Sequence, residues 1–304
     1  MKNEVKITGI GVHSGRAANL RIYSQSRAGI FFRRTDLQDA RPMPAVYSNV
    51  YNTALQNTII GECPDCVQTI EHLMAALSVC GIYSAAIDID GPETPILDGS
   101  AAEFIKKLQK FQNSFPAKKI IVKREVIAHR RELIRKLPLI RRMKLFFYNL
   151  ANGRREDGFV KLSPDPRGLC INATLDYPDK IIGRQSAEFL LDYSEKSKKD
   201  FVKNFASART FGRISEWEYL KARGMGLGAN ENNVIVLNAA GDGTLNRLRW
   251  PDEFVRHKII DAIGDMATAG GQVYGKLTSV KGSHGLNNLA LRKLFSNPEN
   301  YDII

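Results

Sequence analysis

FVRHKIIDAIGD, at residues 254–265, has the apolar periodicity of an α-helix packed against a core. Its polar side chains share one stripe, because His257, Asp261 and Asp265 are spaced four residues apart, with Lys258 beside them. A His and an Asp one helical turn apart can reach the same metal ion, although a surface ion pair explains this spacing more often. The stripe is therefore either a solvated edge of the helix or part of a site.

The sequence around this helix predicts an α+β fold. The first hundred residues alternate strand-like runs with turns, and two helical stretches follow at residues 68–81 and 100–111. A second series begins with strand-like residues 118–129 and 170–177, continues with helical residues 198–210 and 216–224, and ends with a helix near 286–295. We therefore predict an N-terminal α+β domain at residues 1–117 and a C-terminal α+β domain at residues 118–304.

Composition indicates a globular protein with an excess of positive charge. Hydrophobic residues make up 43% of the 304 residues and charged residues 25%, and the net charge is +12. No apolar run reaches the ~20 residues of a bilayer span, and the N-terminus lacks the apolar segment of a signal peptide, so we expect a cytoplasmic protein. Residues 123–144 concentrate the charge, with nine Lys or Arg against two Glu. The protein should attract anions, which include nucleic acid, phosphorylated small molecules and acidic membranes.

Histidines and cysteines mark the candidate sites. His72 follows Glu71 inside an apolar helix, and His284 lies between glycines; one more His beside His257 and Asp261 would complete a three-ligand zinc site. Cys63 and Cys66 form a CxxC that is either half of a structural zinc site or a pair of free thiols, and four cysteines are too few for a disulfide scaffold. The segment GIGVHSG is typical of a strand, a turn and a second strand. His13 in this segment either faces a functional cleft or lies away from one.

Several motifs, taken together and in order, resemble the zinc-dependent UDP-3-O-acyl-N-acetylglucosamine deacetylases of lipid A synthesis. The matching stretches are TGIGVHSG, FFRRTDL, QTIEHLMAAL, GPETPILDGSAAEF, IGRQ, ARTFG, DEFVRHKIIDAIGD and KGSHGLNN. They span nearly the whole chain. The resemblance implies two similar domains, each a β-sheet with a pair of α-helices, with the helices packed between the two sheets.

The resemblance also implies roles for individual residues. The implied zinc ligands are His72, His257 and Asp261, and iron(II) can take the place of zinc. Glu71 matches the general base and His284 the general acid, whose partner is the carboxylate of Asp265. Thr210 matches the hydroxyl beside the developing oxyanion, and Lys258 matches the lysine beside the metal. Phe211 matches a residue that contacts the substrate, and the resemblance implies that Thr210 and Lys258 bind the substrate as well. A bell-shaped pH dependence set by Glu71 and His284 would follow.

Two segments depart from the family pattern. The stretch after ARTFG, which would line an apolar passage for the acyl chain, carries Arg213, and Trp217 and Val234 would narrow it, so we expect an altered acyl-length preference. The basic stretch at residues 130–155 is longer than the corresponding hairpin. It is either a solvated surface or an element that contacts an anionic membrane peripherally at the inner membrane surface.

The predicted function is hydrolysis of the N-acetyl group of a UDP-linked acylated glucosamine. The alternative is a non-catalytic basic binding protein of the same fold, which would bind nucleic acid or lipid through its positive patch. We favour the hydrolase because every expected catalytic position holds the expected residue. We accordingly expect a monomer that does not bind nucleic acid.

Overall fold

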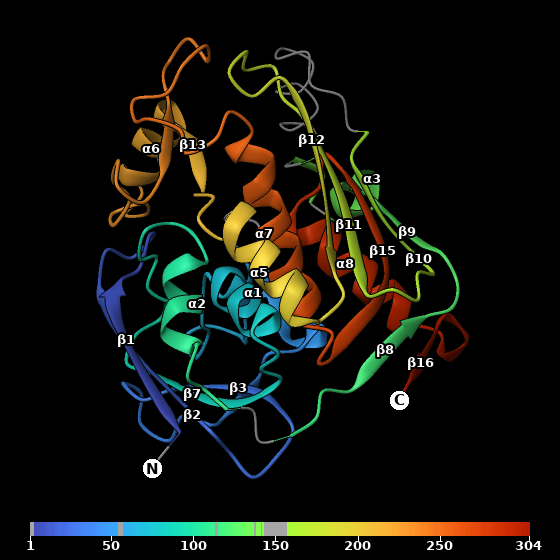
Figure 1. Cartoon of the computed structure of the whole chain (residues 1–304). Coiled ribbons are helices and arrows are strands. Elements are labelled where there is room, and N and C mark those ends of the chain that lie inside the picture. Colours follow the sequence, from blue (N-terminus) through green and yellow to red (C-terminus); the bar gives the residue numbers. More distant parts are fainter. Residues whose placement is uncertain (1–2, 54–56, 113–114, 137, 141, 143–156) are drawn as a thin grey trace.

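The computed structural model describes residues 3–304 with the exception of 54–56, 113–114, 137, 141 and 143–156. The predicted α+β class is confirmed, because the described residues form two large sheets, with helices packed between them (Figure 1), and two short two-stranded ladders. Residues 137, 141 and 143–155 of the predicted membrane element lie outside the described residues. The division into domains 1–117 and 118–304 stays a prediction.

The first sheet is built by the N-terminal part of the chain and has the strand order β1-β2-β7-β3-β4. Its strands are β1 (Glu4–Ile10), β2 (Ala17–Tyr23), β3 (Gly29–Arg34), β4 (Met43–Pro44) and β7 (Ser84–Ile89). Side chains of β2 alternate between exposed and buried, so one face of the sheet contributes to the core. The segment GIGVHSG, residues 9–15, covers the end of β1 and most of the turn that leads to β2, in agreement with the predicted strand, turn and strand. A short ladder of β5 (Val50–Asn52) and β6 (Ile59–Ile60) stands apart.

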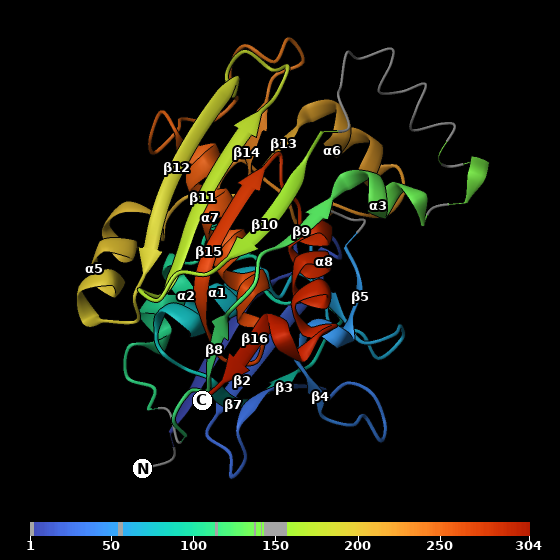
Figure 2. The same ribbon diagram turned by 90° about the vertical axis from the view of Figure 1, so that its right-hand side faces the viewer.

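The second sheet is built by the C-terminal part of the chain and is displayed face-on in Figure 2. Its strands are β8 (Lys119–Val122), β9 (Val126–His129), β10 (Phe159–Ser163), β11 (Leu169–Asp176), β12 (Arg184–Leu191), β15 (Gln272–Val280) and β16 (Tyr301–Ile303). The long strand β15 pairs in parallel with both β11 and β8. A separate parallel pair, β13 (Phe211–Arg213) and β14 (Ile235–Leu237), is joined through α6 (Ile214–Lys221).

Helices fill the space between the two large sheets (Figure 1). They are α1 (Glu71–Val79), α2 (Ala102–Leu108), α7 (Glu253–Ala267) and α8 (His284–Phe295). Their buried side chains and those of both sheets form one hydrophobic cluster. The remaining described helical elements are α3 (Arg130–Arg135), α5 (Glu195–Asn204) and the 3₁₀ turns η1 (Tyr47–Asn49) and η2 (Pro298–Asn300).

The helices α1 and α7 approach each other unusually closely at Gly264. A Cβ atom at this position would lie 2.0 Å from the carbonyl oxygen of Glu71, so only glycine fits against the backbone of α1. The contact fixes the first turn of α1, with Glu71 and His72, against α7 three residues beyond Asp261. The core packing therefore builds the candidate site.

The CxxC segment differs from both sequence interpretations. Cys63 and Cys66 form a disulfide in the turn between β6 and α1, so they are neither free thiols nor half of a zinc site. The turn brings their Cα atoms to 4.6 Å, within the range that a disulfide bridges. Sequence spacing alone could not distinguish these outcomes, because the turn geometry decides whether the two sulfur atoms face each other. Cys80 and Cys170 are free.

Candidate metal and catalytic site

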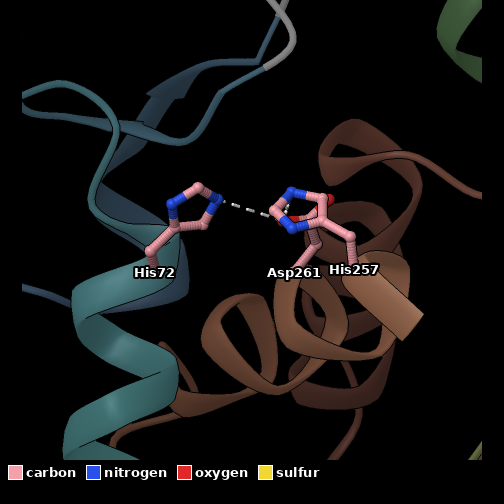
Figure 3. Close-up of side chains that lie close together, drawn as sticks. All are labelled: His72, His257 and Asp261. Atoms are coloured by element: carbon pink, nitrogen blue, oxygen red, sulfur yellow. Dashed lines mark ion pairs between the residues drawn. The ribbon is translucent and has the colours of Figure 1, made fainter. Parts of the chain in front are cut away.

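The predicted metal ligands come together from α1 and α7. One ligand atom each from His72, His257 and Asp261 lies within 4.8 Å of the others, and all three residues are buried. Figure 3 shows the two imidazole rings converging on the carboxylate. The Oδ1 atom of Asp261 lies 3.3 Å from Nε2 of His257 and 3.6 Å from Nε2 of His72.

This donor set fits a tetrahedral divalent metal. Two ligand atoms bound to zinc at tetrahedral angles lie about 3.3 Å apart, close to the separations of Asp261 Oδ1 from both imidazole nitrogens. The same oxygen is buried and has no hydrogen-bond partner among the described residues, although a buried carboxylate oxygen without a partner is costly. A metal bound between these atoms would satisfy it. Two imidazoles and one carboxylate are a set that zinc accepts, and they leave a coordination position open.

Neighbouring groups orient the ligands. The Nδ1 atom of His257 lies 3.0 Å from the carbonyl oxygen of Ala208 and donates to it, which leaves Nε2 free for a metal. Burial lowers the pKa of His257 to about 3, so its ring is neutral, as a ligand must be. Burial opposes ionisation of Asp261, but His257 and the Lys258 ammonium, 2.7 Å from Oδ2, outweigh it and hold the pKa of Asp261 well below its usual range.

Glu71 lies at the beginning of α1, next to the ligand His72. Its Oε2 atom accepts a hydrogen bond of 2.9 Å from the backbone N–H of Thr58. Burial raises the pKa of the Glu71 carboxyl above its ordinary value, so the carboxylate binds a proton more readily than an exposed one. A carboxylate with these properties is suited to accept a proton from water.

His284 is paired with Asp265, as the resemblance implied. Nδ1 of His284 lies 2.8 Å from Oδ2 of Asp265, and Nε2 lies 3.9 Å from Oδ2 of Asp261, beside the metal ligands. Burial alone would lower the pKa of His284, but the Asp265 carboxylate outweighs it and raises the pKa to about 9. The ring is therefore protonated at neutral pH and presents Nε2–H toward the ligand cluster.

Two cavities that share part of their walls border the site. The larger, about 430 Å³, is lined by Glu71, His72, Thr210, Trp217 and Val234, and the smaller, about 210 Å³, by Lys258 and His284. Phe211 and Arg213 line both. His13 also lines the larger cavity. Strand β13 holds Phe211 at the junction, and the backbone of Thr210 is fixed by hydrogen bonds to Gly99 and Ile235.

The sequence did not predict the residues that hydrogen-bond to Asp265, nor the ion pair that anchors the segment before Thr210. Asp265 accepts 2.6 Å and 2.8 Å hydrogen bonds from the Thr58 hydroxyl and the Asn287 amide. Asn287 follows His284 by three residues, so helical spacing could have found it, whereas Thr58 carries no such signal. Arg209 forms a buried ion pair with Glu253, with Nε 2.9 Å from Oε1, which ties the segment containing Ala208 and Thr210 to the beginning of α7.

The basic stretch is described only in part. Within that part, α3 is followed by Leu139 and Ile140, which are 67% and 70% exposed. None of the described helices is both long enough and apolar enough to traverse a bilayer.

Comparison with known proteins yields one family. The family model described as UDP-3-O-acyl N-acetylglycosamine deacetylase matches residues 1–296. A relative from Geobacter sp. (strain M21), named UDP-3-O-acyl-N-acetylglucosamine deacetylase, is 35% identical over 303 residues, which are 99% of this chain and 90% of the relative. Proteins of the same name from Shewanella oneidensis and Teredinibacter turnerae are 34% and 32% identical, over 99% and 100% of this chain and 90% and 92% of their own lengths. The chain therefore belongs to the UDP-3-O-acyl N-acetylglycosamine deacetylase family.

Proposed function

We propose that this protein hydrolyses the N-acetyl group of UDP-3-O-acyl-N-acetylglucosamine in lipid A biosynthesis, as a metal-dependent amide hydrolase. The observation that carries the proposal is the buried cluster of His72, His257 and Asp261, with the Glu71 carboxylate adjacent in sequence to His72 and the protonated His284 imidazole 3.9 Å from Asp261. Glu71 and His284 thereby supply a base and an acid beside a metal-binding set, which amide hydrolysis requires. The family membership of the chain supports the same activity.

The metal would be held by His72, His257 and Asp261. Zinc is the proposed ion, with iron(II) as the alternative that the same donors accept. A divalent ion bound here would act as a Lewis acid and would lower the pKa of a bound water from 15.7 toward about 7.

Glu71 acts as the general base in this proposal. Its raised pKa matches a group that must take a proton from water near neutral pH and hold it during the reaction. The hydrogen bond from the Thr58 N–H fixes Oε2. The carboxylate can therefore take the proton without a change in its position.

Thr210 and Lys258 act on the negative charge that develops. Addition of water to the acetyl carbonyl produces an oxyanion, and the Thr210 hydroxyl, which lines the same cavity as Glu71, is proposed to donate a hydrogen bond to it. The Lys258 ammonium remains charged beside Asp261, because that carboxylate raises its pKa despite partial burial. Its charge compensates the carboxylate and the developing oxyanion.

His284 acts as the general acid. An amine is a poor leaving group, so cleavage of the C–N bond requires a proton on the departing nitrogen. His284 carries that proton at neutral pH because of Asp265, and Nε2 faces the ligand cluster.

The two cavities are proposed to bind the two ends of the substrate. The cavity of about 430 Å³ extends past Trp217 and Val234 and is assigned to the acyl chain. The cavity of about 210 Å³ carries Lys258 and Arg130, cations that suit a diphosphate. Phe211, on the walls of both cavities, would contact the sugar between them.

The activity is tested by removing and restoring the metal. The chelated protein should lose turnover of UDP-3-O-acyl-N-acetylglucosamine and regain it on addition of zinc or iron(II). Glu71→Gln should reduce kcat by about 10²- to 10⁴-fold, whereas Glu103→Gln, on the partly exposed surface of α2, should leave it unchanged. A protein that neither binds metal nor deacetylates, yet binds nucleic acid in a salt-sensitive manner, would favour the non-catalytic alternative.

Peripheral contact with an anionic membrane on the cytoplasmic side is a further part of the proposal. The described portion of residues 130–155 exposes Leu139 and Ile140 near Arg135 and Lys136, a combination that favours an interfacial position on acidic lipid. Binding to vesicles of phosphatidylglycerol should fall after Leu139→Asp together with Ile140→Asp. Unchanged binding of this variant would reject the contact.

A further inference from the structure

The disulfide turn lies directly before the helix that carries Glu71 and His72. We propose that Cys63 and Cys66 are a reversible dithiol/disulfide site that exchanges with low-molecular-weight thiols and disulfides, and that its oxidation state controls the rigidity of the hairpin entering the catalytic site. The redox site stands independently of the proposed function. Its effect on turnover rests on that function.

The two sulfur atoms differ in their access to solvent. Cys63 is exposed, whereas Cys66 is only 2% exposed, so an incoming thiol or disulfide reaches Cys63 first. Such asymmetry suits an exchange pair, in which the accessible cysteine reacts and the buried one resolves the mixed disulfide. The other two cysteines are poor competitors, because burial raises the pKa of both Cys80 and Cys170, the former to about 11.

Arg34 holds the turn in place independently of the disulfide. Its Nη1 atom donates hydrogen bonds of 3.0 Å and 2.9 Å to the carbonyl oxygens of Pro64 and Cys66. Its Nε and Nη2 atoms are paired with the carboxylate of Asp36, and its side chain is 7% exposed. These contacts do not involve the sulfur atoms, so they remain after reduction and keep the two thiols within reach of each other, although the turn loses its covalent link.

The hairpin formed by residues 58–71 contacts the proposed catalytic groups at both of its ends. Ile60 and Val67 exchange two backbone hydrogen bonds of 3.0 Å just inside the disulfide. On the outgoing side, Thr58 donates its N–H to Glu71 and its hydroxyl to Asp265. On the returning side, the chain enters α1 at Glu71 itself. A looser turn would therefore shift the contacts of both the proposed base and the partner of the proposed acid.

The exchange is balanced as a two-electron transfer. The Cys63 thiolate attacks one sulfur of a small disulfide, so a protein–ligand S–S bond forms and one thiolate leaves. The Cys66 thiolate then attacks the Cys63 sulfur, closes the protein disulfide and expels the second thiolate. The two cysteine protons end on the two released thiols, and the small disulfide is reduced as the protein dithiol is oxidised.

The first test measures the redox state without using activity. The full chain is equilibrated in buffers of reduced and oxidised glutathione, and free thiols are alkylated and located by mass spectrometry. We expect Cys63 and Cys66 to pass together from the alkylated to the bonded state within this series, while Cys80 and Cys170 stay alkylated. A pair that remains wholly bonded or wholly reduced throughout would overturn the proposal.

The second test identifies the attacking sulfur with matched variants. Cys66→Ser in oxidised glutathione should accumulate one glutathionyl group on Cys63. Cys63→Ser, which leaves only the buried sulfur, should accumulate none on Cys66. The opposite pattern, or no adduct on either variant, would contradict the assigned order of exchange.

The third test measures the coupling to the site. Reduction should make amide hydrogen exchange at Ile60 and Val67 about tenfold faster, and it should lower kcat/KM about threefold or more through displaced catalytic groups. The double variant Cys63→Ser/Cys66→Ser should be indifferent to the same buffers, which controls for effects of thiols on the metal. Equal exchange and equal turnover in both redox states would refute the coupling. Redox-dependent exchange in a protein without deacetylase activity would support the redox control of the hairpin and reject the proposed function.

Discussion

The close contact of α1 and α7 makes Gly264→Ala a stringent test of how the metal site is built. The added Cβ would lie 2.0 Å from the Glu71 carbonyl oxygen, 2.7 Å from its carbonyl carbon and 3.0 Å from its Cα. All three atoms belong to the backbone of α1, so no side chain can rotate away to relieve the clash. Ordinary contact begins at 3.4 Å, which requires the two helices to separate by about 1.4 Å at this point.

The expected effects differ for stability and for metal binding. Alanine favours the helix by about 1 kcal/mol over glycine, while overpacking costs about 1–3 kcal/mol, so the net loss of unfolding free energy should be modest. Metal binding is less tolerant, because ligand distances must match to within about 0.2 Å. His72 follows Glu71 directly, and His257 and Asp261 lie on the other helix. We expect zinc to bind about 100-fold more weakly, as if one ligand were misplaced.

The assay is a zinc titration against a competing chelator, with thermal unfolding of the metal-free protein measured in parallel. Gly91→Ala is the matched control, since its Cβ would meet the Ala17 carbonyl oxygen at an ordinary 3.6 Å. A Gly264→Ala protein that binds zinc within about twofold of the wild type would refute the claim that this contact sets the ligand spacing.

Three further outcomes follow from the structure. The value of kcat/KM should fall as the pH decreases through the raised pKa of Glu71, which must be ionised, and as the pH increases through about 9, where His284 loses its proton. Asp265→Asn should move the alkaline limb of this profile to lower pH. An unmoved limb would count against the pairing of Asp265 with His284. Glu253→Ala should lower the free energy of unfolding by about 3–5 kcal/mol in denaturant titrations of the metal-free protein, because it leaves Arg209 buried without its carboxylate. Trp217→Ala should change the ratio of kcat/KM for a longer acyl chain to that for a shorter one by about tenfold in favour of the longer chain, since each additional methylene bound contributes about 1–3 kcal/mol to transition-state binding. An unchanged ratio would contradict the assignment of this cavity to the acyl chain.

Much of the architecture follows from local periodicity. The apolar positions of residues 254–265 predicted α7, and the structure buries the apolar side chains of that stretch together with His257, Asp261 and Asp265. The His and Asp pair with four-residue spacing does converge with His72, although its spacing alone favoured a surface pair. The family resemblance decided between these interpretations, because it supplied the third ligand from a helix about 190 residues earlier in the sequence.

The remaining features depend on contacts that local patterns do not encode. Thr58 and Asp265 are 207 residues apart in the sequence and come into contact only through the tertiary fold. The disulfide depends on how one turn directs Cys63 and Cys66, which the same CxxC spacing leaves open. Gly264 resembles any helical glycine in the sequence, and its importance arises only from the backbone of α1 that lies against it.

The two histidines beside Asp261 demonstrate why residue type alone could not assign their roles. Both rings are buried, and burial by itself would make both neutral. His257 donates from Nδ1 to a carbonyl of Ala208, which adds no full charge, and its pKa falls to about 3. His284 donates from Nδ1 to the carboxylate of Asp265, and its pKa rises to about 9. The other charges act in the same direction, because Asp261 and Glu71 also raise the pKa of His284, whereas Lys258 and His72 offset the effect of Asp261 on His257. One ring is thus a neutral ligand and the other a protonated acid, and α7 carries both the ligand and the carboxylate that charges the acid.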